Sequence, residues 1–201
     1  MNLQEYCESM KECTLCALSK SRTNVVFGVG DEHADILFVG EAPGFFEDKQ
    51  AEPFVGPAGQ FLDQLLASIS LKRNDVYITN TVKCRPPENR DPLPEEIETC
   101  NQYLRFQLEY IKPKLICTLG NHSTKLLLET KSGITSLHGR KFMKGGTFYI
   151  PLYHPAAALH RPPLRSTLIE DFERLKQYLS EVNEAGQPQE KEAVPEQLGL
   201  F

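Results

Sequence analysis

The sequence predicts a three-layer α/β/α fold with a central, mostly parallel four-stranded sheet. Two observations support this prediction: the chain contains four short apolar runs, and the segments between them have helical spacing of apolar residues. Strands that alternate with helices form an open sheet covered on both faces. A chain of 201 residues can bury one substantial core. We therefore expect one domain over residues 1–180 and a tail over residues 181–201.

The expected strands are the apolar runs at residues 35–41, 76–81, 114–121 and 147–154. After the first run, apolar residues recur at helical spacing between residues 61 and 69. A second helix is expected with apolar residues spaced over residues 97–111, because Pro94 provides a favourable first turn before them and Lys112-Pro113 a stop after them. Asn121 is expected to cap the helix that follows the third strand. A last helix is expected over about residues 164–180.

Polar residues follow the ends of the expected strands. Glu41, Asn80 and His154 each stand where an apolar run ends. Because ligands bind beyond the carboxyl ends of the strands in such sheets, a carboxylate, an amide and an imidazole are expected to converge on one crevice. The alternative is ordinary punctuation between strand and loop.

The composition limits where the protein works. No apolar run approaches the roughly 18 residues that a membrane span needs, and the N-terminus lacks the pattern of a signal peptide. We expect a cytoplasmic protein without membrane contact. Thiols stay reduced in that compartment, so the six cysteines are interpreted as ligands, nucleophiles or core residues.

The spacing of the cysteines favours a metal site. Cys13 and Cys16 form a C-x2-C pair, and Cys84 and Cys100 are the best candidates for the other two ligands because a proline-rich loop separates them. The alternative for Cys100 is a core position on its helix, which is also the preferred interpretation for Cys7 and Cys117. Four thiolates bind zinc or an iron-sulfur cluster, and the spacing does not choose between them.

The charge pattern leaves nucleic-acid binding open. Residues 181–201 contain five glutamates and one lysine, so the body of the chain, whose total net charge is −5, is nearly neutral. Local basic clusters can still bind nucleic acid, with solvated surface as the alternative. The clusters are Lys83, Arg85 and Arg90; Arg140, Lys141 and Lys144; and His160, Arg161 and Arg165.

Three stretches closely resemble the family-4 uracil-DNA glycosylases in order and spacing. They are GEAPGFFEDKQAEPFVGPAGQFLDQLL, TNTVKCRPPENRDPLPEEIETC and YHPAAALHRP, and the four cysteines accompany them. The resemblance implies an α/β/α fold and hydrolysis of the N-glycosidic bond of uracil in single- and double-stranded DNA. It also implies a 4Fe-4S cluster on Cys13, Cys16, Cys84 and Cys100.

The resemblance assigns roles within the uracil pocket. Phe54 is similar to the aromatic residue that stacks on the flipped base, and the Asn80 amide is suited to donate to uracil O4 and accept from N3–H. His154 is expected to stabilise negative charge on the leaving base. The backbone amides of Gly40, Glu41 and Ala42 resemble further donors to that charge.

The water-activating group is less well defined. Glycosylases with a GQDPY motif place an aspartate where this chain has Ala42, so the role must be filled otherwise. We expect Glu41 to orient or deprotonate the water and Glu47 to line the pocket and help exclude thymine. Asp48 is a candidate for sharing either task.

The resemblance also suggests a DNA-contacting surface. Leu159 is expected to enter the vacated base stack, with a packing role as the alternative, while Arg161 and Arg165 hold phosphates. Lys83 and Arg85 are expected to add phosphate contacts. The chain departs from the family at Ala51 and Glu52, where many members have Gly-Arg, so any DNA contact of that arginine is in doubt.

The tail ends in a possible recognition motif. QLGLF resembles the pentapeptide by which bacterial proteins bind the sliding clamp, and a disordered acidic linker precedes it. The expected anchors are Gln197, Leu198, Leu200 and Phe201. The alternative is a fraying terminus.

The sequence leaves two other functions as alternatives. One is a related protein that traps uracil-DNA covalently without turnover, although the histidine-containing insertion of that protein after the Asn motif is absent here. The other is a zinc-stabilised nucleic-acid-binding module. We expect the protein to be a monomer.

Overall fold

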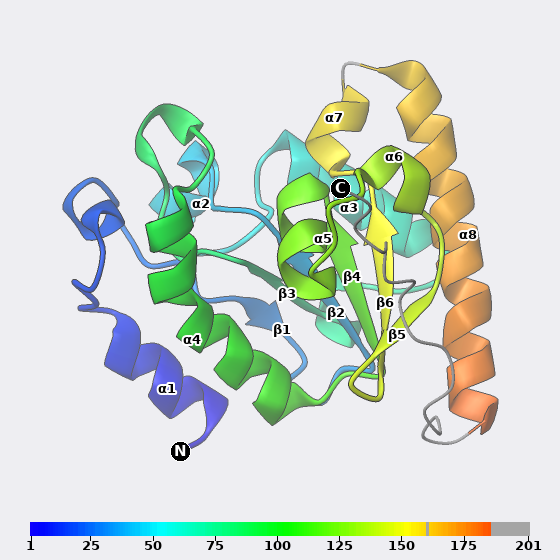
Figure 1. Cartoon of the computed structure of the whole chain (residues 1–201), viewed down its shortest axis with the longest axis horizontal. Coiled ribbons are helices and arrows are strands. Elements are labelled where there is room, and N and C mark those ends of the chain that lie inside the picture. Colours follow the sequence, from blue (N-terminus) through cyan, green and yellow to red (C-terminus); the bar gives the residue numbers. More distant parts are fainter. Residues whose placement is uncertain (160, 186–201) are drawn as a thin grey trace, which may run out of the picture.

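The computed structural model describes residues 1–159 and 161–185. Its centre is a six-stranded sheet with strand order β1-β3-β2-β4-β6-β5 (Figure 1). Neighbouring central strands pair in parallel. These strands correspond to the four expected apolar runs: β2 Ile36–Gly40, β3 Tyr77–Asn80, β4 Leu115–Leu119 and β6 Thr147–Leu152. The predicted fold class is confirmed.

The sheet has two more strands than the sequence indicated. β1 (Val29–Gly30) pairs antiparallel with β3 at one edge, and β5 (Phe142–Lys144) pairs antiparallel with β6 at the other. Neither is fully buried, and both are too short to show the alternation of apolar and polar residues that identifies a strand.

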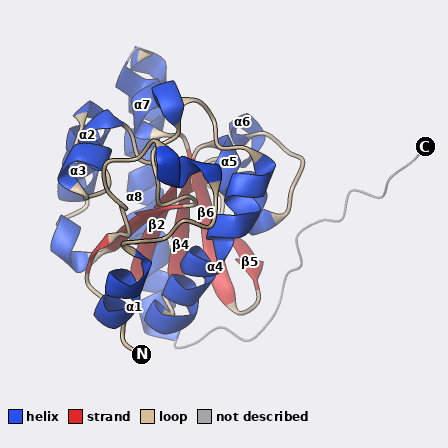
Figure 2. Ribbon diagram, turned by 90° about the vertical axis from the view of Figure 1, so that its left-hand side faces the viewer, coloured by secondary structure: helices blue, strands red, loops and turns tan. Residues whose placement is uncertain are grey.

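Helices cover both faces of the sheet, as Figure 2 shows. One layer contains α1 Leu3–Met10, α4 Pro94–Ile111 and α5 Asn121–Leu128. The other contains α3 Pro57–Ser68, α7 Pro155–Leu159 and α8 Pro162–Ala185. Shorter elements lie in the connections: α2 Phe45–Gln50, α6 Ile134–Leu137, η1 Ala17–Lys20, η2 Arg73–Asp75 and η3 Pro87–Asn89.

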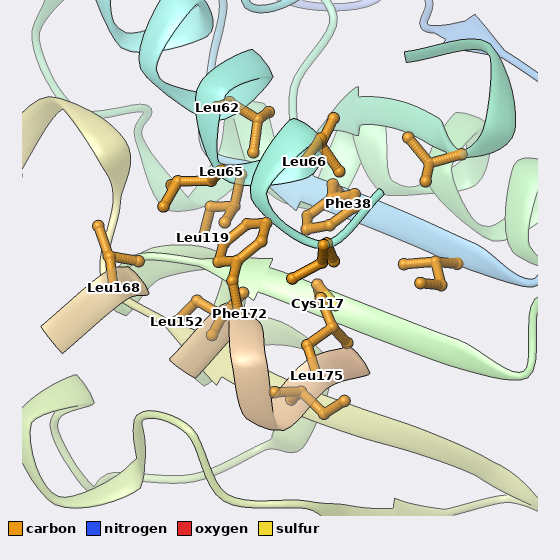
Figure 3. Packing of buried hydrophobic residues seen from close by; sticks show 14 of the residues in the cluster. Phe38, Leu62, Leu65, Leu66, Cys117, Leu119, Leu152, Leu168, Phe172 and Leu175 are labelled. Carbon is orange, nitrogen blue, oxygen red and sulfur yellow. The ribbon is translucent and has the colours of Figure 1, made fainter. Parts of the chain in front are cut away.

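Alternate residues of each central strand face opposite layers. Phe38 of β2 packs toward α3 and α8, where its ring stacks on Phe172 at a centroid distance of 5.9 Å (Figure 3). The neighbouring Leu37 and Val39 pack toward α1 and α4. Because β2 is buried on both faces, its sequence is a continuous apolar run.

Helix boundaries differ from the expected ones in two places. The prediction that Asn121 caps α5 is wrong: Gly120 occupies the N-cap, and the Asn121 side chain instead accepts a hydrogen bond from the Ile134 N–H at 2.8 Å. The last helix, α8, continues beyond residue 180 to Ala185. The four candidate clamp anchors at residues 197–201 lie outside the described residues.

No helix within residues 1–159 and 161–185 is long and apolar enough to cross a membrane.

The strand order creates a reversal point beside β2, because the chain passes from β2 to β3 on one side and then to β4 on the other. Such reversal points are where ligands bind in open α/β sheets. The carboxyl ends of the parallel strands, at the upper end of Figure 1 near α2 and α7, are thus the place for a site.

Candidate functional site

A cavity of about 350 Å³ lies at the carboxyl ends of the central strands. The structure brings together there the three polar residues that end separate strands in the sequence, Glu41, Asn80 and His154. Three further expected residues also line the cavity: Ala42, Glu47 and Phe54. Residues from the segments after β2, β3 and β6 therefore meet around one space.

Gly40 allows two of these side chains to approach each other. It is the last residue of β2 and pairs in register with Asn80, the last residue of β3. A Cβ on Gly40 would overlap the Asn80 amide oxygen and would lie 2.7 Å from Phe54 Cζ. Any larger residue would push the amide and the ring apart. The carbonyls of Gly40 and Glu41 accept hydrogen bonds from the N–H groups of Thr81 and Val82, which ties the two strand ends together.

Asn80 presents an unengaged amide to the cavity. The residue is only 2% exposed. The described residues provide no hydrogen-bond partner for that amide, although the Asn80 carbonyl accepts from Lys83 Nζ at 2.7 Å. No fully buried side-chain nitrogen or oxygen of the described residues lacks a partner, so the amide atoms are reached from the cavity that Asn80 lines and are available to a ligand there.

Phe54 is held by its backbone. Its φ of 54° is in the left-handed region, which is costly for a residue other than glycine. Arg73 stabilises this conformation, since its guanidinium donates to the carbonyls of Pro53 at 2.6 Å and Phe54 at 3.0 Å. The Phe54 ring lies near the His154 ring, with 5.6 Å between the centroids and 29° between the planes. Both rings border the cavity.

The departure from the family pattern is visible beside Phe54. Ala51 has a φ of 58°, a conformation that favours the glycine many family members have there. Glu52 pairs with Arg73 at 3.3 Å and so contributes to the support of the Phe54 backbone. The residue at position 52 therefore has a structural contact within the protein.

The two carboxylates of α2 face different parts of the protein. Glu47 lines the cavity, and its Oε1 accepts hydrogen bonds from the N–H groups of Val55 at 3.1 Å and Gly56 at 3.0 Å. Asp48 is 1% exposed, and its Oδ1 accepts from the N–H of Thr23 at 2.8 Å. The expectation that Asp48 shares a task in the site is wrong, because its carboxylate is used to anchor the segment after η1.

His154 is held in one tautomer. Its Nδ1 accepts a hydrogen bond from the Ala156 N–H at 3.2 Å, so in the neutral ring the proton is on Nε2. Burial lowers the pKa of His154 to about 4. Near neutral pH the ring is therefore uncharged, and Nε2–H is a hydrogen-bond donor.

Glu41 has a partner, His122, that the sequence did not indicate. His122, in the first turn of α5, places Nδ1 2.6 Å from Glu41 Oε2, and its Nε2 lies 3.5 Å from Asp91 Oδ2. Burial raises the pKa of Glu41, and the positive charge of protonated His122 opposes this shift. His122 was visible in the sequence as a histidine just after the third strand, but its contact with Glu41 depends on β4 lying beside β2.

Of the residues expected to contact DNA, one is buried in the structure and the others are at least partly exposed. Lys83 is fully buried, with its ammonium on the Asn80 carbonyl and on Gln107 Oε1 at 2.6 Å. Its predicted phosphate contact is therefore wrong. Arg85 remains partly exposed and donates to Asn89 at 2.7 Å.

The expected residues on the other side of the cavity lie at the surface. Leu159 is 38% exposed at the end of α7, which disfavours the alternative that it is a packing residue. Arg161 and Arg165 are exposed. Arg165 reaches back to Gln64 at 2.9 Å and lies over the Phe61 ring at 4.3 Å.

The four candidate ligand cysteines surround one small cavity between α1, the segment after β3, and α4. Three of their sulfurs accept hydrogen bonds: Cys13 from the Tyr103 hydroxyl at 3.1 Å, Cys84 from Arg22 at 3.4 Å and Cys100 from the Lys83 N–H at 3.3 Å. Such donors stabilise thiolates that bind a metal. The donor set therefore fits a thiolate-bound metal centre.

The other two cysteines behave as core residues. Cys117 is fully buried between β4 and the layer of α3 and α8 (Figure 3). Cys7 is half-buried on α1 against the other core cluster. Neither lines the cavity of the four candidate ligands.

Comparison with known proteins agrees with this geometry. The family model described as the uracil DNA glycosylase superfamily matches residues 27–181. The chain is 46% identical over 185 residues to a type-4 uracil-DNA glycosylase of Sulfurisphaera tokodaii. This alignment covers 88% of the chain and 84% of the relative. The chain is 45% identical to the type-4 enzyme of Archaeoglobus fulgidus, with 87% and 92% covered, and 43% identical to that of Thermotoga maritima, with 86% and 92% covered. The chain therefore belongs to the uracil DNA glycosylase superfamily and, within it, to the type-4 uracil-DNA glycosylases.

Proposed function

We propose that this chain removes uracil from DNA by hydrolysing the N-glycosidic bond, leaving an abasic site for base excision repair. The observation that carries the proposal is the convergence of Asn80, Phe54 and His154 on one cavity at the reversal point of the sheet. The type-4 uracil-DNA glycosylases to which the chain is similar support the same conclusion.

Recognition of the base rests on Phe54 and Asn80. A base in a duplex must be flipped out before it can be bound, which costs a few kcal/mol of stacking and pairing energy. Stacking on the Phe54 ring recovers part of this cost. The free Asn80 amide donates to O4 and accepts from N3–H, whereas cytosine reverses that pattern and would leave buried polar groups unpaired.

The leaving base is stabilised as an anion. As the bond between C1′ and N1 breaks, its electron pair moves onto the uracil ring, and the sugar acquires oxocarbenium character. The neutral His154 donates its Nε2–H to the developing negative charge. Backbone amides around Gly40 and Ala42 are proposed as further donors.

Activation of the attacking water is assigned to Glu41. The water oxygen forms a bond to C1′, and its proton passes to the Glu41 carboxylate. His122 holds that carboxylate in place by the 2.6 Å hydrogen bond. Glu47 lines the pocket while fixing the loop that carries Phe54, so its proposed part in excluding thymine is through pocket shape.

DNA is proposed to contact the end of the sheet at which the cavity opens. Leu159 enters the vacated stack, Arg161 and Arg165 hold phosphates beside it, and Arg85 contacts the strand on the other side of the cavity. All four side chains are at least partly exposed.

The four cysteines are proposed to hold a 4Fe-4S cluster. Cys13, Cys16, Cys84 and Cys100 would supply its thiolates, and the cluster would pin the N-terminal segment to the segment after β3. The reacting groups border a different cavity. The proposed role is thus structural.

Two proposals rest on the sequence alone. Gln197, Leu198, Leu200 and Phe201 are proposed to bind a bacterial sliding clamp, which deletion of residues 197–201 would abolish while leaving activity on short oligonucleotides. Unchanged clamp affinity after this deletion would refute it. We also propose that the protein is a monomer and that it works in the cytoplasm.

The test is incubation of metal-loaded protein with single- and double-stranded uracil-DNA, followed by alkaline cleavage of abasic sites. We expect cleavage at uracil only and none with thymine in its place. Asn80→Ala should lower the rate of uracil removal by at least about 100-fold, because the base then lacks its hydrogen-bond partner. The circular dichroism spectrum of this variant should be unchanged. Formation of no abasic site would reject the glycosylase, and a complex that survives denaturation would favour the non-turnover alternative.

A further inference from the structure

Helix α2 exposes two adjacent aromatic side chains. Phe45 is 48% exposed and Phe46 is 51% exposed. Their rings meet edge to face, with 5.6 Å between centroids and 82° between planes. Neighbouring exposed aromatic residues usually mark an interaction site, because water contact with so much apolar surface is unfavourable. Neither residue lines the catalytic cavity, so catalysis does not account for this exposure.

The pair lies at the rim of the cavity. Gly44 precedes the pair and Glu47 follows it, and both of these residues line the cavity. Phe46 also borders the loop that carries Phe54, since its Cδ2 lies 3.2 Å from where a Cβ on Gly56 would be. The aromatic surface is therefore continuous with the proposed uracil site.

Two cations accompany the aromatic surface. The Arg85 guanidinium lies 5.2 Å from the centroid of the Phe45 ring, and Lys49 Nζ lies 5.9 Å from it. Aromatic rings beside cations are the combination with which proteins bind unpaired nucleotides: bases stack on the rings, and phosphates approach the cations. An apolar protein surface would offer the two cations no negatively charged partner. Binding to a membrane would need a larger apolar face than these two rings provide.

We propose that Phe45 and Phe46 form a stacking platform for the unpaired base next to the flipped uracil. This inference rests on the proposed function and names a second base-binding surface for it. α2 and α7 both lie at the end of the sheet where the parallel strands finish (Figure 1). The strand would thus have the platform on one side of the flipped nucleotide and Leu159 on the other.

The platform should affect binding more than chemistry. Because base stacking on an aromatic side chain is lost on truncation to alanine, we expect KM for single-stranded uracil-DNA to rise about tenfold in Phe45→Ala and more in the double variant. kcat should stay within about twofold, since neither ring touches the reacting atoms. Phe45→Tyr, which keeps an aromatic ring at this position, should have a KM close to that of the parent protein. Ile169→Ala, which removes an exposed apolar side chain of α8, is the matched control.

A direct readout uses a single-stranded oligonucleotide with 2′-fluoro-2′-deoxyuridine, which resists hydrolysis, and 2-aminopurine on its 5′ or 3′ side. We expect binding to quench 2-aminopurine on one side only. In Phe45→Ala and the double variant the quenching should be lost at saturating protein.

Three outcomes would overturn the proposal: unchanged KM and quenching in the double variant, quenching equal on both sides, or a loss of kcat and free-uracil inhibition without a change in KM. The last result would show that the pair supports the Phe54 loop instead. Because the probe reports binding without turnover, failure of the platform is distinct from failure of the glycosylase activity.

Discussion

The imidazole of His122 and the carboxylate of Glu41 form a 2.6 Å hydrogen bond between Nδ1 and Oε2. This contact joins the first turn of α5 to the residue that follows β2. Asp91 lies on the other side of the ring, 3.5 Å from Nε2. Glu41 can accept a proton from water only when it is ionised, and burial raises its pKa. His122 is therefore placed to keep Glu41 in the ionised form that its proposed role requires.

Replacing His122 by Ala should shift the activity profile to higher pH. The charge and hydrogen bond of His122 oppose the effect of burial on the pKa of Glu41, so their loss raises that pKa and removes activity at a higher pH than in the parent. We expect kcat/KM at about pH 6 to fall roughly tenfold, the value of one charge-assisted hydrogen bond. The pH dependence of kcat/KM measures this, and His122→Gln should restore part of the loss.

His138→Ala is the matched control for that experiment. His138 binds the buried Asp171 at 2.8 Å in the same manner, but it lies between α6 and α8 and does not line the cavity. Its loss should lower the melting temperature and leave the shape of the pH profile unchanged. If both histidine variants shift the profile equally, the assignment of His122 to Glu41 is wrong.

His154 should not titrate within the working range of the enzyme. Burial lowers its pKa to about 4, so the ring is neutral above pH 5 and keeps its Nε2 proton for the leaving base. We expect His154→Ala to lower kcat about 100- to 1,000-fold, as loss of an anion-stabilising donor does. NMR titration of the ring should show no protonation between pH 5 and 8, and a midpoint near 6.5 would contradict this account.

The same pKa has a consequence for stability. The unfolded chain takes up a proton on His154 near pH 6.5, whereas the folded protein takes it up only near pH 4. The contribution of neutral His154 to the free energy of unfolding is therefore complete above about pH 6.5 and is lost as the pH falls toward 4. Urea unfolding at several pH values should show a shallower acid decline in His154→Ala than in the parent.

The cysteine site should distinguish ligands from core residues. Cys13→Ser or Cys84→Ser should remove bound iron and the broad visible absorbance, because each deletes a proposed ligand. Cys117→Ala should keep the iron and lose stability, since this side chain fills the core beside Phe38. A colourless parent protein with stoichiometric zinc would overturn the cluster and leave the four-thiolate site in place.

Ala51 is a position where a smaller residue should stabilise the fold. Its φ of 58° strains any residue with a Cβ. Ala51→Gly should raise the free energy of unfolding by about 0.5–1 kcal/mol, the strain relieved less the added entropy of the unfolded chain. Chemical denaturation measures the change. Ala67→Gly, within α3, should have the opposite sign, and destabilisation in both variants would show that Ala51 is not strained.

The parts of this protein that were predictable are those set by local pattern. The strands β2, β3 and β4 are buried along their whole length and β6 over its last three residues, so each lies in an apolar run, and Pro94 marks the start of α4. The convergence of Asn80 and His154 followed from the rule that parallel strands end at one edge. The edge strands β1 and β5 were missed because so few residues cannot show a period.

The missed features of the site depend on contacts between distant segments. Lys83 looked like a surface cation in a basic stretch, and only the packing of α4 beside β3 supplies Gln107 as a distant partner for its ammonium, which also binds Thr79 of β3. Asp48 looked equivalent to Glu47, yet helical geometry directs the two carboxylates to different neighbours. Composition and spacing contain no information on such partners.

Lys83 also links two regions that have separate tasks. Its N–H donates to the Cys100 sulfur, while its ammonium binds the carbonyl of Asn80. The residue proposed to read the base and one of the residues proposed to hold iron thus both contact Lys83, the first through its ammonium and the second through its backbone N–H. An evolutionary lineage that discarded the cysteines would leave the buried N–H of Lys83 without its acceptor beside the end of β3, so loss of the metal ligands would require a new partner for that group.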